Sequence, residues 1–223
     1  MICAIACAIV AVRWLGRHRV LKQVCAKLVD PSEWHEHSII TSTTGVWRGA
    51  RVWIRLDRRN NYIIRVAVPR WPAAVAVVRR FQGDEIGDPA FDASLRVFGE
   101  EAAWRAVLDS ATRARLVEVF RDAEGALEAR HLELRVEDPR RVETTLDRCA
   151  ELARTLPEDT GDSLERVFDN TTRESIAAMR ESNYRWLVAR DWNVLRVYRA
   201  ASSDADPSIA AWGSKHAPDG VFR

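Results

Sequence analysis

Carboxylates recur around one short turn in this chain. Asp84, Asp88 and Asp92 are spaced four residues apart. Asp88 belongs to the turn Gly87-Asp88-Pro89, and the other two stand before and after it. Such a set could act in general acid and base catalysis or bind a metal through oxygen. The stretch lacks the dense Asp-x-Asp-x-Asp pattern and the closing Glu of a calcium loop. Because Gly and Asp-Pro favour a tight turn, we interpret these carboxylates first as capping groups of that turn.

A His-x-His pair is the second pattern with ligand chemistry. His35 and His37 could hold zinc, but no nearby Cys or carboxylate triad completes the set, and an exposed loop is the simpler interpretation. Together with Asp88 and Asp92 they are the candidate groups of one alternative function, a metal- or carboxylate-dependent hydrolase. The chain has no nucleophile elbow, phosphate-binding glycine loop or His-Glu-x-x-His motif. We therefore expect a non-enzymatic protein with no catalytic residue, metal or cofactor.

Charge is distributed unevenly along the 223 residues. Residues 1–80 hold 14 Lys and Arg against 4 Asp and Glu, and the remainder holds 20 against 28. The basic residues of the first part include Arg48, Arg51, Arg55, Arg58 and Arg59. They support a second alternative, nucleic-acid binding, although no recognised nucleic-acid-binding motif accompanies them. An anionic membrane surface is the partner that the sequence favours over nucleic acid.

The N-terminus is the reason for that preference. Residues 2–12 are wholly apolar, and basic residues follow, namely Arg13, Arg17, Arg19, Lys22 and Lys27. This order matches the positive-inside rule for a segment whose following domain stays in the cytoplasm. Although the run is shorter than the roughly 20 residues of a spanning helix, we predict a membrane-anchor, transmembrane helix over residues 1–28. The expected location is a bacterial inner membrane with the soluble part cytoplasmic. A buried N-terminal helix is the alternative.

The middle of the chain predicts an α+β domain over residues 29–157. Apolar and polar residues alternate in 52–57 and again in 64–68, around turn residues, which indicates a β-hairpin. Further strands are expected at 73–78, 95–97 and 132–136. Helical spacing follows Glu100, and Asp138-Pro139 begins a helix that extends to Leu156. We expect an antiparallel β-rich domain closed by helices, with Cys149 in its core.

The last part of the chain predicts a short stack of helices over residues 158–216, followed by a tail at 217–223. Helical stacks present elongated surfaces to protein partners. The aromatic residues Tyr184, Trp186 and Trp192 are the candidate binding residues of this region. An aromatic residue in such a pattern is more often part of the core, which is the alternative for each of them.

Several of these features occur together in one group of proteins. The chain has an apolar N-terminus, Gly87-Asp88-Pro89-Ala90-Phe91-Asp92 before a short strand, and an Arg-x-x-Leu helix at Arg113. In these features it resembles uncharacterised bacterial, myxobacterial-type membrane-anchored proteins with a HEAT-like helical tail. Ala178-Met179-Arg180 and Asp204-Ala205-Asp206-Pro207 stand where HEAT-like units carry similar motifs, although Ala210 replaces an expected Arg. The resemblance implies a membrane-anchored interaction or scaffold module with a protein partner, and no known activity.

Overall fold

The computed structural model describes residues 15–36, 39–59, 61–79, 82–156 and 162–218. Its strands form one eight-stranded sheet in the order β1-β2-β3-β4-β8-β7-β5-β6, and every pair of neighbours is antiparallel. The strands are β1 Val29–Glu36, β2 Ile39–Trp47, β3 Ala50–Leu56, β4 Tyr62–Ala67, β5 Val75–Val78, β6 Arg96–Gly99, β7 Glu124–Glu128 and β8 His131–Val136. The predicted α+β class with an antiparallel sheet is confirmed.

Side chains of the central strands alternate between two different environments. Val52 and Ile54 of β3 are buried, as are Ile64 and Val66 of β4, while the residues between them are exposed or half-buried. Successive side chains of a strand point to opposite faces, so one face of the sheet holds the core. The predicted hairpin is therefore confirmed, with β3 and β4 paired through Ile54 and Ile64.

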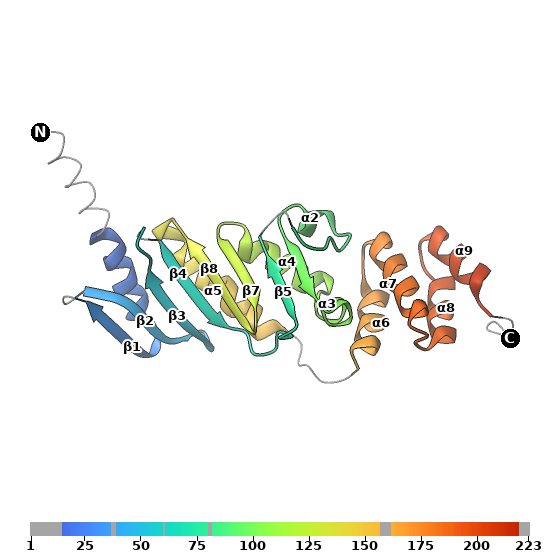
Figure 1. Ribbon diagram of the computed structural model, residues 1–223, viewed down its shortest axis with the longest axis horizontal. Helices are drawn as coiled ribbons and strands as arrows, with labels where there is room; N and C mark the ends of the chain where they lie inside the picture. The colour runs from blue at the N-terminus through green and yellow to red at the C-terminus, as the bar shows by residue number, and fades with distance from the viewer. Residues whose placement is uncertain (1–14, 37–38, 60, 80–81, 157–161, 219–223) are drawn as a thin grey trace, which may run out of the picture.

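Helices cover only that buried face. The helix of residues 15–25, α4 (Ser110–Phe120) and α5 (Val142–Thr155) lie behind the sheet in Figure 1. Leu21 and Val24 of the first helix belong to the core, as do Leu146 and Leu152 of α5. No described helix covers the opposite face, which is drawn in front in Figure 1. The domain is thus a two-layer structure with one open sheet face.

The remaining helices extend the molecule away from β6. Short helices α2 (Pro89–Asp92) and α3 (Glu101–Val107) flank β6, and η1 (Pro139–Arg141) precedes α5. The tail consists of α6 (Ser163–Arg173), α7 (Ala177–Ala189), α8 (Val194–Ser202) and α9 (Pro207–His216). Figure 1 shows these four helices beyond α3, so that sheet and tail lie in one row along the long axis.

A second apolar cluster holds the tail together. It contains Val167 of α6, Leu187 of α7 and Val197 of α8, and it also takes in Ala106 of α3. Met179 of α7 belongs instead to the core of the sheet domain. Because residues of each part contribute to the core of the other, the tail packs directly on the domain.

The transmembrane helix expected within residues 1–28 is wrong for the part of the chain that the structure describes. There, no helix combines the length and the apolar character needed to cross a membrane. The helix of residues 15–25 carries Arg17, Arg19 and Lys22, and it packs Leu21 and Val24 against the sheet. The apolar run 2–12 itself lies outside the described residues.

Two local expectations also differ from the structure. The N-terminal helix, expected over residues 1–28, ends at Cys25, and His35, expected in an exposed loop, belongs to β1. Asp30 has a positive φ of 49°, and the pairing of β1 with β2 shifts register twice. These irregularities, together with Pro31, remove the regular alternation by which a strand is recognised.

Candidate binding surface

The carboxylates of the Asp-Pro turn serve the backbone around them. Asp88 is the N-cap of α2 and accepts hydrogen bonds from the backbone N–H groups of Ala90 (3.0 Å) and Phe91 (3.3 Å). Asp92 accepts one from the N–H of Ile86 (3.0 Å). This is the capping role expected of a turn carboxylate, and it confirms the interpretation of this stretch as a capped turn.

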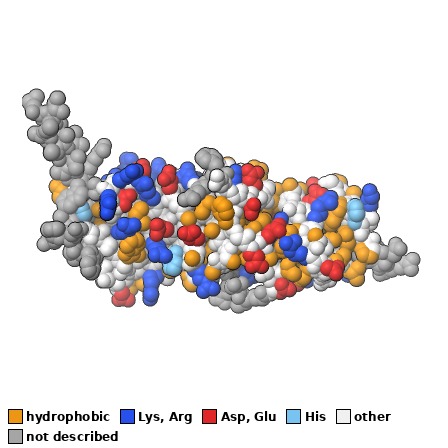
Figure 2. All heavy atoms as spheres, viewed as in Figure 1, with side chains coloured by type: hydrophobic (Ala, Val, Ile, Leu, Met, Phe, Trp, Pro, Cys, Tyr) orange, Lys and Arg blue, Asp and Glu red, His pale blue; other side chains and the backbone are white. Residues whose placement is uncertain are grey.

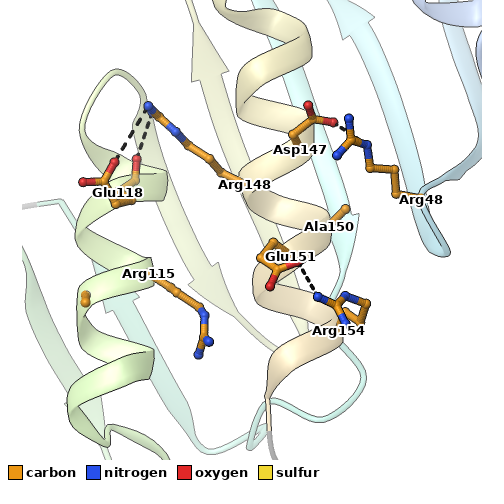
Figure 3. A pocket seen from close by; sticks show the side chains of 9 residues that line it. Arg48, Arg115, Glu118, Asp147, Arg148, Ala150, Glu151 and Arg154 are labelled. Carbon is orange, nitrogen blue, oxygen red and sulfur yellow. Dashed lines mark hydrogen bonds and ion pairs between the residues drawn. The ribbon is translucent and has the colours of Figure 1, made fainter.

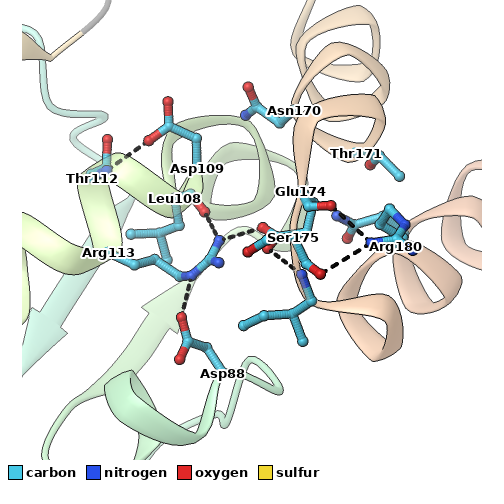
Figure 4. A network of polar contacts seen from close by, with 12 residues as sticks. Asp88, Leu108, Asp109, Thr112, Arg113, Asn170, Thr171, Glu174, Ser175 and Arg180 are labelled. Carbon is cyan, nitrogen blue, oxygen red and sulfur yellow. Dashed lines mark hydrogen bonds and ion pairs between the residues drawn. The ribbon is translucent and has the colours of Figure 1, made fainter. Parts of the chain in front are cut away.

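Asp88 also anchors a buried arginine (Figure 4). Arg113 of α4 is 2% exposed; its Nε lies 2.7 Å from Asp88 and its Nη1 2.9 Å from Glu174. Nη1 also donates to the carbonyl oxygen of Leu108 (2.8 Å). Glu174 stands between α6 and α7, so this one guanidinium joins the sheet domain to the tail. The Arg-x-x-Leu position found in the sequence is therefore structural.

The electrostatics of this cluster favour the charged forms of Asp88 and Arg113. Burial raises the pKa of Asp88, but the hydrogen bonds from Arg113 and from the N–H groups of Phe91 and Ala90 outweigh it, so the pKa is lowered. Burial opposes the charge of Arg113, yet Glu174 and Asp88 raise its pKa overall. A carboxylate held in this way is a poor general base, and its oxygens already have partners.

A half-buried ion pair in the tail gives a testable pH dependence. Arg180 of α7 donates to both oxygens of Asp204 (2.9 and 2.8 Å), and this bond chiefly lowers the pKa of Asp204. A carboxyl whose pKa is lower in the folded state stabilises the fold above its unfolded pKa of about 3.9, and this contribution is lost as pH falls through the folded pKa. We expect urea unfolding midpoints to fall on acidification below about pH 4, and to fall less for Asp204→Asn. An equal fall in the variant and the natural protein would contradict this assignment.

The structure describes only part of the residue set of the hydrolase alternative. In the described part of the chain, no group of three His, Cys, Asp or Glu side chains is arranged to hold a metal ion. Asp84 is exposed, and its backbone forms a bridge with Val97. His37 and the side chain of His35 lie outside the described part, so their proposed ligand role stays untested.

The structure separates the five arginines of the predicted basic cluster. Arg48, in the turn between β2 and β3, points to the helix side, where its Nε lies 2.9 Å from Asp147 of α5 (Figure 3). Arg58 and Arg59 stand in the turn after β3. Only Arg51 and Arg55 lie on the open face of the sheet.

On that face the two arginines flank an aromatic ring. Trp53 is half-buried between Arg51 and Arg55 on β3, and the alternation of the strand places all three on the same side. Register pairs Trp53 with Arg65 of β4 on one side and with Thr44 of β2 on the other. Arg65 thus completes a triangle of arginines around Trp53. We call Arg51, Trp53, Arg55 and Arg65 the arginine face.

The three arginines have no acidic partner. Within the described residues, no ion pair or hydrogen bond joins Arg51, Arg55 or Arg65 to another side chain. Arg55 makes a cation–π contact, with its guanidinium carbon 5.3 Å from the ring centroid of Trp53. All three are exposed. By contrast, most exposed arginines on the helices lie within 4.0 Å of a carboxylate, as Arg121 does with Glu118 and Arg154 with Glu151. The arginine face is accordingly a patch whose arginines are not ion-paired among the described residues, with Glu133 of β8 opposite Arg65 in the register and Asp30 in the hollow as the neighbouring carboxylates.

The surface is hollowed at this patch. A cavity of about 830 Å³ opens on the sheet and is lined by Arg51, Trp53 and Arg65, with Thr44 and His131 beside them. Figure 2 shows several Lys and Arg side chains at the sheet end of this side of the molecule, with some acidic side chains among them. The volume lies in the range of small-molecule sites, about 300–1,000 Å³.

A second hollow, between α4 and α5, is charged but internally neutralised (Figure 3). Its volume is about 680 Å³, and ion pairs join Arg148 to Glu118 and Arg154 to Glu151 along its walls. Arg115 is the lining arginine that Figure 3 draws without an ion pair. With its other arginines paired, this hollow is a weaker candidate for an anion than the arginine face.

The aromatic residues expected to bind a protein partner lie mostly inside the tail. Tyr184 and Trp186 are 2% and 7% exposed and belong to the second apolar cluster. Trp186 is covered by Arg190, whose guanidinium lies 3.8 Å from its ring centroid. Trp192 is half-buried, with its ring 5.5 Å from that of Phe168. No contact with a partner tests their role, which stays a prediction, and Trp192 has the largest accessible part.

Sequence reasoning missed Arg65, Trp53 and His131 as members of one surface. Arg65 stands in the recognised hairpin, and the parity of the alternation places it on the same face as Trp53. The sequence did contain a signal for this placement: pairing the apolar residues of the two hairpin strands, Ile54 with Ile64, also pairs Trp53 with Arg65. His131 comes from β8, about 65 residues further along, and only the strand order brings it to Ala67 of β4.

The fold and this surface define an α+β protein with a one-sided antiparallel sheet and a helical extension. No protein-family profile matches the chain, and no curated protein matches it. Among solved structures, the mycobacterial trehalose monomycolate transport factor A, TtfA, is similar with a TM-score of 0.44 and 17% sequence identity. That similarity covers 66% of this chain and 99% of that chain. The resemblance to the myxobacterial-type family stays a prediction.

Proposed function

We propose that this chain is a non-enzymatic interaction module whose arginine face binds an anionic partner. The observation that carries the proposal is a triangle of three exposed arginines around one half-buried Trp53, none of them ion-paired within the part of the chain that the structure describes. Guanidinium groups bind carboxylate and phosphate in a bidentate fashion. A sheet places these groups on a rigid support, so little conformational order is lost on binding.

The tail enters the proposal as a HEAT-like stack that offers a separate surface to a protein partner. Support for this part comes from Arg180 and Asp204, the residues that carry the motif resemblance. They form a half-buried ion pair between α7 and the turn before α9. A cytoplasmic location also belongs to the proposal, because Cys25 and Cys149 are free thiols that suit a reducing compartment. Residence at the bacterial inner membrane stays a prediction, which the vesicle measurement below addresses.

Retention of the full-length protein on immobilised heparin, a defined polyanion, tests the arginine face. We expect replacement of Arg51, Arg55 and Arg65 by Gln to shift elution to clearly lower salt. Each lost anion contact lowers the slope of log affinity against log salt by about 0.7 to 0.9, so the triple variant should lose about 2 units of slope.

A matched control separates this surface from net charge. Arg121, Arg154 and Arg173 are exposed arginines on helices, and their replacement by Gln removes the same three charges. We expect this control to elute close to the natural protein. Equal shifts in both triple variants would mean that retention follows overall charge, and the proposal would be wrong.

A further inference from the structure

The spacing of the arginine face fits a repeating anion better than a single one. Arg51 and Arg55 each stand two residues from Trp53, which places their Cα atoms about 7 Å to either side of it along β3. Arg65 faces Trp53 from the neighbouring strand. Arg51 and Arg55 are therefore about 13 Å apart, and Arg65 lies between them on the neighbouring strand. Positive groups spread along a line in this way can follow the phosphates of an extended single strand of nucleic acid.

Trp53 supplies what a nucleic-acid base requires. Its ring is half-buried in the open face, and Arg55 lies 5.3 Å from its centroid. Bases stack on aromatic rings and on guanidinium planes, and this stacking tolerates any sequence because every base has a π-face. The ring and the guanidinium together offer a stacking platform between the phosphate-binding positions.

The shape of the surface argues against a membrane and against a nucleic-acid duplex as the anionic partner. Trp53 lines a hollow of about 830 Å³ instead of projecting from the surface, so it is badly placed to insert into a lipid bilayer. A duplex presents phosphates, but its bases are stacked on each other and their faces are not available to Trp53. Thr44 and Asp30 in the same hollow add a hydroxyl and a carboxylate that can meet the polar edges of an unpaired base.

We infer that the arginine face binds single-stranded nucleic acid, with phosphates on Arg51, Arg55 and Arg65 and one base stacked on Trp53. This inference rests on the proposed function and specifies the partner of the same surface. It differs from the preference for a membrane surface drawn from the sequence, because the hollow and the position of Trp53 become visible only in the folded chain.

Fluorescence anisotropy with the full-length protein tests the inference. The probes are a labelled 12-nucleotide single strand of mixed sequence, an abasic strand of the same length, and the corresponding duplex; vesicles containing phosphatidylglycerol are tested by co-sedimentation. We expect the single strand to bind at least about tenfold more tightly than the abasic strand, the loss associated with one stacked base. Its salt slope should be about −2, from three phosphates at about 0.7 each.

Two substitutions at one position isolate the stacking. Trp53→Leu is expected to weaken binding of the single strand about tenfold and to leave the abasic strand unaffected. Trp53→Phe keeps an aromatic ring and should stay close to the natural protein. Circular dichroism of both variants checks that the sheet is intact, and if Trp53→Leu does not fold, the comparison of normal with abasic strands still decides.

The outcomes distinguish the inference from the proposal beneath it. Equal affinity for normal and abasic strands, tighter binding of the duplex, or binding of vesicles alone would overturn the inference. In any of these cases, the anionic-partner proposal would still stand if the triple variant of Arg51, Arg55 and Arg65 bound the abasic strand, the duplex or the vesicles more weakly than the natural protein. If that variant bound every probe as well as the natural protein, the proposal itself would be wrong.

Discussion

Replacing Arg113 by methionine is expected to lower the free energy of unfolding by about 3–5 kcal/mol. The guanidinium is 2% exposed and ion-paired to Asp88 and Glu174, whose side chains are 12% and 4% exposed. Removing it leaves two carboxylates buried without a counter-charge, and one such group alone is costly. Urea unfolding followed by circular dichroism measures the change.

Two comparisons make this result specific. Arg121→Met removes an exposed arginine just after α4, and surface ion pairs contribute about 0–1 kcal/mol, so the change should be small. Combining Arg113→Met with Asp88→Asn and Glu174→Gln should restore much of the lost stability, because no buried charge remains and Asn still caps α2. A loss below about 1 kcal/mol for Arg113→Met would contradict the assigned role of this cluster.

Gly99→Ala is expected to destabilise the protein by about 3 kcal/mol or more, from backbone strain and overpacking together. Gly99 ends β6 with a φ of +113°, and an added Cβ would lie 1.8 Å from the carbonyl oxygen of Ala74. Gly99 is paired with Val75 of β5, so the two strands would have to move apart. Thermal and urea unfolding both report this loss.

Gly49→Ala separates the two causes. Gly49 also has a positive φ, +86°, but nothing lies within 4 Å of its added Cβ. Its substitution should therefore cost only the left-handed strain of about 1–2 kcal/mol. Equal losses at the two glycines would show that close packing of β5 on β6 does not matter.

The elements that sequence reasoning found are those with local signals. The β3–β4 hairpin follows from the alternation of Val52 and Ile54 with polar residues, and the start of the helical segment from the cap at Asp138. Both signals lie within a few residues of the structure that they specify. They needed no information about the rest of the chain.

Other elements depend on tertiary contacts. Strand β7 places a single fully buried residue, Leu127, in the core, so its sequence carries almost no pattern. The strand order joins β4 to β8 across some 70 residues, and periodicity does not encode such pairing. The burial of Tyr184 and Trp186 likewise depends on α6 and α8, which pack on either side of α7.

The binding surface was partly predictable. Arg51 and Arg55 were recognised as basic residues, and their parity on β3 was readable from the alternation. The sequence did not show which arginines are ion-paired. Arg48 forms an ion pair with Asp147, about 100 residues away, while Arg51 has no ion pair among the described residues. The distinction between structural and free charge therefore had to come from the fold.

Side-chain NMR of the uniformly ¹⁵N-labelled full-length protein tests the central claim most directly. Arginine Nε–H and tryptophan Nε1–H signals are followed while the 12-nucleotide single strand is added. The account predicts progressive shifts for the residues of the arginine face, with the signals of Arg113 and of Arg115 in the helix-side hollow unchanged. Shifts concentrated at Arg115 and its neighbours, with the arginine face unaffected, would contradict it.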